Sequence, residues 1–215
     1  MKKRIVFLLT LFTVLGSYAQ GKKAYALYTS EGKKTNFSKL VKKAVATDLI
    51  LFGEIHNNPI AHWLELELAT ELSTQRELVF GAEMFEVDQQ RELNLYLQDS
   101  IKHKVFAERV DLWSNYETDY RPLVELAKKT KRPFLATNLP KIYAKLVYEE
   151  GFEPLQNLVA DERQYMAPQP IPFDPELSQY KKMLTLFSSD HCAPELVKAQ
   201  AMNCLLYTSP SPRDS

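Results

Sequence analysis

Three short apolar runs, each followed by a stretch with helical periodicity, constrain how this chain can fold. The runs occupy residues 49–53, 78–85 and 133–138, and the helical stretches after them occupy 59–73, 87–97 and 141–150. Further helical patterns cover residues 36–46 and 120–130. Strands that alternate with helices form parallel sheets joined by right-handed crossovers. The sequence therefore predicts an α/β fold with a mostly parallel sheet flanked by helices.

The first nineteen residues have the pattern of a secretory signal peptide. Lys2, Lys3 and Arg4 precede an apolar stretch at 5–15, and Ala19 lies at a small-residue cleavage position before Gln20. No cysteine lies near this position, which argues against a lipoprotein. We therefore expect an exported protein of the periplasm or cell envelope, soluble after cleavage near Ala19.

Residues 204–215 have no periodicity and resemble one reading frame of a sequencing-library adapter. We expect this tail to be non-native, the alternative being a natural disordered Ser- and Pro-rich tail. Between the two ends, residues 20–203 are enough for one domain with its own core. Cys192 is then the single remaining cysteine, so no intrachain disulfide framework is expected.

The composition excludes several functional classes. Basic and acidic residues number 27 each, giving a formal net charge of zero, which gives no support to a nucleic-acid partner. After the signal peptide, no apolar segment is long enough to cross a membrane. The sequence also lacks a GxSxG elbow, an HExxH zinc motif, a CxxC pair and a Gly-rich phosphate loop.

Two carboxylates follow predicted strands where apolar residues are the usual occupants. Glu54 comes after the run at 49–53, His56 is two residues further on, and Glu83 lies near the end of the run at 78–85. Buried carboxylates need a metal, a cation or a donor as partner, and a nearby imidazole adds a ligand or base. Alternatively, each strand ends earlier and the carboxylates face water or pair with Lys or Arg. Their repetition on two strands favours a ligand site at the carboxyl edge of the sheet.

The other histidines carry weaker signals. His62 lies six residues after His56, a spacing unlike a helical zinc pair, and is expected on the surface or behind the ligands. His103 lies in a Lys-rich stretch and is expected to be solvated. His191 is next to Cys192 and is a candidate metal or haem ligand, although most such thiols are small apolar fillers.

An aromatic and basic segment, followed by a proline-rich one, lies in the second half of the chain. The first contains Arg109, Trp113, Tyr116, Tyr120 and Arg121. It suits a flat, carboxylated ligand, and it suits an ordinary packed loop equally well. The proline-rich segment at 152–175 has weak periodicity, which predicts a lid, a binding loop or a surface excursion. Helices are predicted again at 177–187 and 194–202.

The chain resembles the ChaN-like family of the haem-binding uptake, Tiki superfamily. The matching motifs lie at residues 51–59, 80–85, 113–122, 136–140 and 199–202, and the likeness covers nearly all of 35–203. It implies an α/β domain that binds haem in iron acquisition, with Glu54, His56 and Glu83 as site residues. It also implies a relation to erythromycin esterases and Tiki-type peptidases. A later Gly- and His-containing motif of the family is not in this sequence, so we expect the sheet to be incomplete at its C-terminal end.

Two functional hypotheses remain open at this point. The first is an exported haem- or iron-binding protein, which dimerises around its ligand and is not an enzyme. Its candidate ligand-binding residues are Glu54, His56, Glu83, Tyr116, Tyr120, Arg121 and His191, with the iron ligand among the histidines and tyrosines. The second is a hydrolase in which His56 is the general base and Glu54 or Glu83 orients it or binds a divalent metal. A plain interaction domain would leave the strand-end carboxylates unexplained, and the resemblance favours haem.

Overall fold

The computed structural model describes residues 23–166 and 176–178, and the chain divides into two compact units, residues 1–40 and 41–215. In the first unit, β1 (Leu27–Tyr28) and β2 (Lys34–Thr35) form an antiparallel hairpin. Gly32 supplies the positive φ of 74° that its turn requires. Helix α1 (Phe37–Val45) begins in this unit and ends in the second. The Asn36 side chain caps it by accepting a hydrogen bond from the Lys39 amide at 3.0 Å.

The second unit contains the remaining elements that the structure describes. They are α2 (Pro59–Ser73), β3 (Phe80–Glu86), η1 (Val87–Gln89), α3 (Gln90–Leu97), α4 (His103–Arg109), η2 (Tyr116–Tyr120), α5 (Arg121–Thr130), β4 (Phe134–Asn138), α6 (Lys141–Glu150), η3 (Glu153–Asn157) and α7 (Ala160–Arg163). The helices predicted at 59–73 and 141–150 are confirmed with the same bounds, and those at 87–97 and 120–130 within a few residues.

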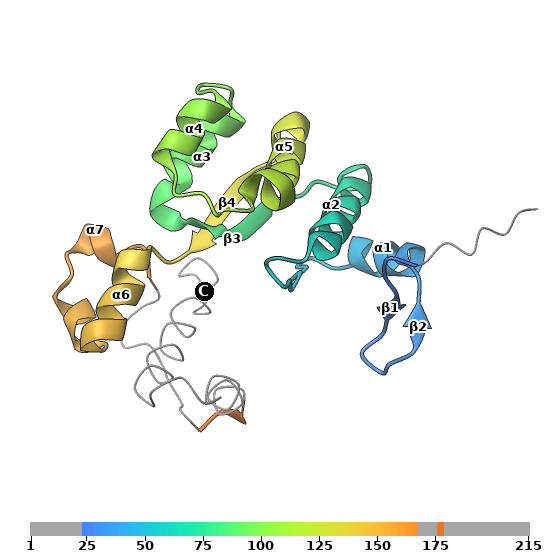
Figure 1. The fold of residues 1–215 in the computed structure, drawn as a ribbon, viewed down its shortest axis with the longest axis horizontal. Coiled ribbons are helices and arrows are strands. Elements are labelled where there is room, and N and C mark those ends of the chain that lie inside the picture. Colours follow the sequence, from blue (N-terminus) through green and yellow to red (C-terminus); the bar gives the residue numbers. More distant parts are fainter. Residues whose placement is uncertain (1–22, 167–175, 179–215) are drawn as a thin grey trace, which may run out of the picture. The chain divides into compact units, whose positions relative to one another are not determined.

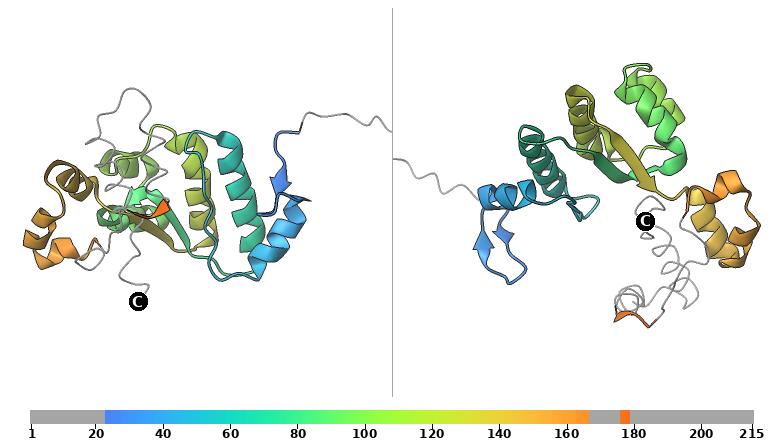
Figure 2. Two further views of the ribbon diagram at one scale, coloured as in Figure 1. Left: turned by 90° about the horizontal axis from the view of Figure 1, so that it is seen from below. Right: turned by 180° about the vertical axis from the view of Figure 1, so that it is seen from behind.

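Strands β3 and β4 form the parallel sheet of this unit, side by side in each view (Figures 1 and 2). Phe80 pairs with Phe134 and Ala82 with Ala136, and the register then shifts before Glu86. The crossover between the strands passes through α3, α4 and α5, and α3 packs against both β4 and α5. The predicted parallel βα arrangement is therefore confirmed for these two strands.

The strand predicted at 49–53 is not formed. Residues 49–55 have no regular secondary structure, and Leu49, Leu51 and Ile55 are 71%, 86% and 68% exposed. A strand requires a hydrogen-bonded neighbour as well as an apolar sequence, and no described strand pairs with this segment. The prediction was wrong because an apolar run in the sequence does not show whether a neighbouring strand is available to pair with it.

An aromatic core packs between the sheet and its crossover helices. The Phe85 side chain is fully buried, and its ring centroid lies 5.8 Å from that of Phe134, 6.0 Å from that of Phe106 and 6.2 Å from that of Tyr116. Edge-to-face rings at these separations stabilise one another beyond the area that they bury. This cluster fixes β3, β4, α4 and η2 relative to one another, because each contributes one of these rings.

A smaller core joins α6 to the segment after it. Val147 and Leu155 are buried in it, together with Tyr143 and Met166. Residues 152–166 were predicted as part of a long irregular loop, but they contain the short helices η3 and α7. Helices of five and four residues are too short to show a 3.6-residue period in the sequence. The predictions for 167–175 and 179–203, His191 included, lie outside the described residues.

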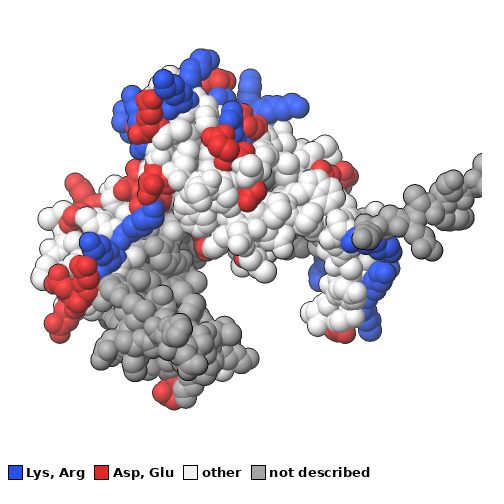
Figure 3. Space-filling view, viewed as in Figure 1, with Lys and Arg blue, Asp and Glu red and all other residues white. Residues whose placement is uncertain are grey.

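Basic and acidic side chains are interspersed on the face drawn in Figure 3. Several are paired, for example Arg109 with Glu92 at 3.0 Å and Arg132 with Glu77 at 2.7 Å. Among the described residues, no helix combines the length and apolar character that membrane crossing would require.

Candidate functional site

Helix α2 carries two polar side chains on its inward face. Asn58 caps the helix by accepting hydrogen bonds from the amides of Ile60 and Ala61, and Pro59 occupies its first turn. His62 and Glu65 are three residues apart, so both lie on one side of the helix. His62 is 4% exposed and Glu65 is partly buried. The fold thus buries an imidazole and a carboxylate where apolar residues would be expected.

His62 meets the carboxylate predicted to be functional. Its Nε2 atom lies 2.9 Å from Glu54 Oε2 and 3.8 Å from Asp119 Oδ2. The same nitrogen is 3.0 Å from the backbone oxygen of His56, whereas Nδ1 has no hydrogen-bond partner in the described part of the chain. The imidazole that contacts Glu54 is that of His62, whereas the histidine expected beside Glu54 was His56.

His56 lies beside this group with its backbone held from two sides. Its carbonyl oxygen accepts hydrogen bonds from Asn115 Nδ2 at 2.6 Å and from His62 Nε2 at 3.0 Å. The imidazole is exposed, lies edge-on to Trp113 at 5.0 Å between ring centroids, and has Nδ1 3.5 Å from the Tyr120 hydroxyl. The two hydrogen bonds to the carbonyl fix the backbone of His56 and thereby position its accessible ring.

Tyr120 bridges the two histidines. Its hydroxyl donates to Glu54 Oε2 at 3.3 Å, and its ring lies edge-on to that of His62 at 4.6 Å between centroids. Burial raises the pKa of the Tyr120 hydroxyl, and the negative charge of Glu54 raises it further. Tyr120 is therefore a hydrogen-bond donor near neutral pH.

Tyr116 is separated from this group. It is 1% exposed within the aromatic core, and its ring stacks on that of His103. Burial raises the pKa of the Tyr116 hydroxyl. His103, expected to be solvated, is instead partly buried against this ring, with Nε2 3.1 Å from Glu117 Oε1.

In the described part of the chain, Glu83 forms no hydrogen bond or ion pair with Glu54 or His56. It is exposed within β3, and its carboxylate has no hydrogen bond or ion pair with another described residue. The carboxylate at the end of β3 is Glu86, which accepts a hydrogen bond from the Lys141 amide at 3.1 Å. Burial raises the pKa of Glu86. Glu83 and Glu54 do not meet at one sheet edge, because the segment before Glu54 forms no strand beside β3.

The guanidinium group of Arg121 forms ion pairs with two acidic residues, each four positions away in the sequence. Its guanidinium lies 2.6 Å from Glu117 and 3.5 Å from Glu125. The group nevertheless remains 37% exposed, so part of it faces solvent. An anionic ligand would therefore have to compete with these two carboxylates for the guanidinium group of Arg121.

Glu65 is the most strongly perturbed acid of the group. Burial is the largest cause and the nearby negative charge of Glu54 the second, and together they raise its pKa to about 7, against a small opposing effect of His62. Near neutral pH this carboxyl is therefore divided between its protonated and charged forms. A charged Glu65 next to Glu54 is unfavourable unless a cation accompanies it.

We expect Glu65→Gln to stabilise the metal-free protein at pH 8 and to change little at pH 4.5. The folded state retains the Glu65 proton to about pH 7, whereas an unfolded Glu releases it near its ordinary pKa, so stability falls as pH rises between the two. Removing this ionisation should raise the free energy of unfolding at pH 8 by on the order of 1–3 kcal/mol. Urea denaturation in EDTA at both pH values measures this, and equal effects at both would contradict it.

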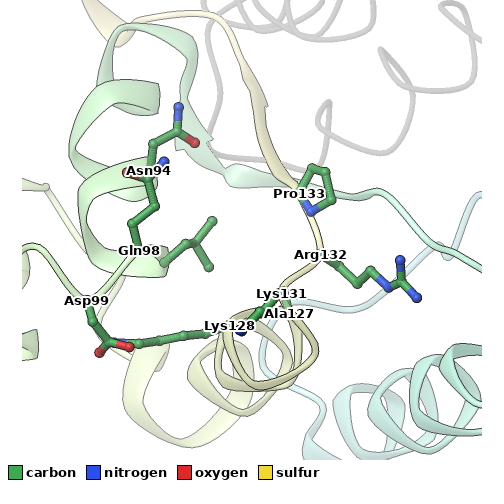
Figure 4. A pocket seen from close by; sticks show the side chains of 9 residues that line it. Asn94, Gln98, Asp99, Ala127, Lys128, Lys131, Arg132 and Pro133 are labelled. Atoms are coloured by element: carbon green, nitrogen blue, oxygen red, sulfur yellow. The ribbon is translucent and has the colours of Figure 1, made fainter.

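A cavity of about 550 Å³ lies away from this group, next to the C-terminal ends of α3 and α5 and the N-terminal end of β4 (Figure 4). It is lined by Asn94, Leu97, Gln98, Asp99, Ala127, Lys128, Lys131, Arg132 and Pro133. None of the residues predicted to be functional lines it. Its Lys128 is already paired with Asp99 at 2.7 Å. Because it lies at the amino end of β4, it is not the carboxyl-edge site that the sequence predicted.

The sequence contained a signal for the residues that were missed. His62 and Glu65 lie on the same helical face as Ala69 and Leu72, which are both buried. This spacing of three, seven and ten residues from His62 places both polar residues on the core side of α2. The prediction of His62 as a surface or supporting residue considered its distance from His56 and not its helical face.

Comparison with known proteins places the chain in a family. Residues 40–205 match the family model described as haem-binding uptake, Tiki superfamily, ChaN. Among solved structures, the chain is similar to ChaN of Campylobacter jejuni, from a structure described as showing cofacial haem binding. The TM-score is 0.59, with 20% identity over 85% of this chain and 69% of that chain. At this identity the likeness concerns the fold, and it confirms the predicted α/β class. No curated protein sequence matches. Because the family model spans most of the sequence, the chain belongs to the ChaN family of haem-binding uptake proteins in the Tiki superfamily.

Proposed function

We propose that this protein is an exported haem-binding protein of the cell envelope that acts in haem or iron uptake. Membership of a haem-binding uptake family supports the general function. The sequence from Lys2 to Ala19 supports export, since it has the three parts of a signal peptide. The haem that the Campylobacter jejuni protein binds supports the same ligand class here.

The observation that carries this proposal is an accessible imidazole held rigidly by its backbone. His56 is exposed while its carbonyl accepts two hydrogen bonds, and Nδ1 faces the Tyr120 hydroxyl. A histidine ligand to iron uses one ring nitrogen for the metal and is oriented through the other. We therefore assign Nε2 of His56 as the iron ligand, with Tyr120 orienting the ring.

The surroundings of His56 suit a porphyrin. The segment leading to it exposes Leu51 and Ile55, and Trp113 presents its ring next to the imidazole. Haem is a flat, largely apolar molecule, and exposed apolar side chains of this kind mark ligand-binding surfaces. The partly exposed Arg121 is a candidate partner for a haem propionate.

The remaining predicted residues divide in two groups. Tyr120 is next to the ligand, but its raised pKa makes the phenol a poorer iron ligand than His56. Tyr116 is buried in the core and Glu83 is exposed in β3, so neither contributes to this proposed site. Glu54 contributes indirectly by accepting the Tyr120 hydrogen bond. Dimerisation around the ligand remains part of the proposal, to be checked by the mass of the haem complex in solution.

A haemin titration tests the proposal. We expect a saturable shift of the Soret band, complete near a fixed molar ratio of haemin to protein. The control is the same titration in buffer and with an unrelated protein of similar charge. A weak shift that rises without saturation, like that of the control protein, would overturn the proposal.

A hydrolase is the second candidate, and one observation favours it. The imidazole of His62 lies 2.9 Å from Glu54 and 3.8 Å from Asp119, so two carboxylates fix the orientation of a candidate base. In this reading the base is His62 and not His56 as the sequence predicted. Turnover of ester or peptide substrates that disappears in Glu54→Gln, with haemin binding intact, would support it.

A further inference from the structure

The group at the start of α2 has the donor atoms of a metal site. One oxygen each from Glu54 and Glu65 and one ring nitrogen of His62 all lie within 4.8 Å of one another. Ligands around one first-row ion at about 2.0–2.2 Å are separated by roughly 3–4 Å, so small side-chain adjustments close the set. Asp119 Oδ2 lies 3.8 Å from His62 Nε2, next to this set of three, and accepts a hydrogen bond from Asn115.

The charges of this group are not balanced by basic side chains. Within residues 23–166 and 176–178, no Lys or Arg pairs with Glu54, Glu65 or Asp119. All three carboxylates are partly buried, and His62 is nearly completely buried between them. Partly buried carboxylates that lack a cation are unfavourable, and a bound ion removes that penalty.

The hydrogen bonds of His62 permit metal binding. Its Nε2 faces two acceptors, Glu54 Oε2 and the His56 carbonyl, so in the metal-free state this nitrogen carries the proton. The buried Nδ1 has no partner in the described part of the chain. Metal binding at Nε2 requires this proton to move to Nδ1, and coordination must outweigh the cost of a buried Nδ1–H that no described residue accepts. Nε2 then presents its lone pair to an ion held by the two glutamates.

We propose that Glu54, His62 and Glu65 bind one first-row divalent ion, of the class of Mn²⁺, Fe²⁺ or Zn²⁺. One imidazole with carboxylates is a donor set of intermediate hardness, which suits these ions better than Ca²⁺ or Cu⁺. This site is separate from the His56 ring, and it does not depend on haem binding. It would give the protein a second, non-haem metal centre behind the proposed iron ligand.

Metal binding by the haem-free full chain tests this proposal. The protein is stripped with EDTA and equilibrated with Co²⁺, whose visible absorption reports coordination, and with Zn²⁺ as competitor. Bound metal is counted by elemental analysis. We expect one equivalent of either ion per chain and displacement of Co²⁺ by Zn²⁺.

Two glutamine variants on the same helix give the matched comparison. Glu65→Gln should weaken Co²⁺ binding at least about tenfold, the effect of 1.4 kcal/mol in binding free energy. Glu67→Gln, at an exposed position of α2, should stay within about twofold of the parent. Circular dichroism spectra of both variants check that a loss of metal is not a loss of fold.

Three outcomes would overturn the proposal. They are substoichiometric Co²⁺ binding by the parent, equal affinities in the parent and Glu65→Gln, and equal losses in Glu65→Gln and Glu67→Gln. A His56→Ala variant that keeps its metal would confirm that this centre and the haem site use different ligands. Loss of metal in His56→Ala with Glu65→Gln unaffected would move the ion to His56 and contradict the assignment.

Discussion

Replacing His56 with alanine should weaken haemin binding by roughly 100-fold, about 2.7 kcal/mol. The expected loss is large because the imidazole is the proposed iron ligand, and alanine offers no donor in its place. The fold should be unaffected, since the His56 ring is exposed and its anchoring contacts are made by its backbone carbonyl. Soret titrations of the variant and parent, with circular dichroism spectra of both, measure this.

Two further variants make the result specific. Tyr116→Phe should bind haemin like the parent, because the Tyr116 hydroxyl is buried in the core and has no partner among the described residues. His191→Ala addresses the other histidine that the sequence singled out. If His191→Ala abolished the Soret shift while His56→Ala kept it, the iron ligand would be His191 and our assignment would be wrong.

Phe85→Ala should destabilise the protein by about 3–5 kcal/mol, the range for deleting a buried aromatic ring. Phe85 is fully buried and touches three other rings, from α4, η2 and β4. Its removal leaves a cavity that these neighbours can close only if the elements that carry them shift inward. Urea denaturation followed by circular dichroism gives the change in the free energy of unfolding.

Leu51→Ala is the control for this measurement. Leu51 is an apolar residue of the segment predicted as a strand, yet it is mostly exposed. We expect its truncation to change the free energy of unfolding by less than about 0.5 kcal/mol. A loss comparable with that of Phe85→Ala would mean that this segment is buried in a sheet, and it would contradict the structure described here.

The sequence predicted those elements whose signals are local. Helix α2 has a capping Asn58 and a Pro59 in its first turn, and its predicted bounds were correct. The run at 49–53 carried an equally strong apolar signal but forms no strand. Strand formation depends on a partner from elsewhere in the chain, and apolar periodicity carries no information about that partner.

The same distinction applies to the site. Glu54 and His56 were predicted to lie together because they are two residues apart, and the structure places both next to Tyr120. Glu83 was predicted to join them from the end of a neighbouring strand, but residues 49–53 form no strand, so Glu54 and Glu83 do not share a sheet edge. The contact between Glu54 and His62 depends on how α2 folds back on the preceding segment. Chain spacing alone could not predict that contact.

The parallel pairing of β3 and β4 has a consequence for the order of folding. All of α3, α4, η2 and α5 lies between these strands in the sequence. The sheet must therefore close a long loop before its hydrogen bonds compensate for the lost chain entropy, whereas each helix forms from neighbouring residues. We expect helical structure to appear early in refolding and sheet pairing to limit the rate. Until the pair closes, the apolar side chains of β3 are open to other chains, so recovery of native protein should fall as its concentration rises.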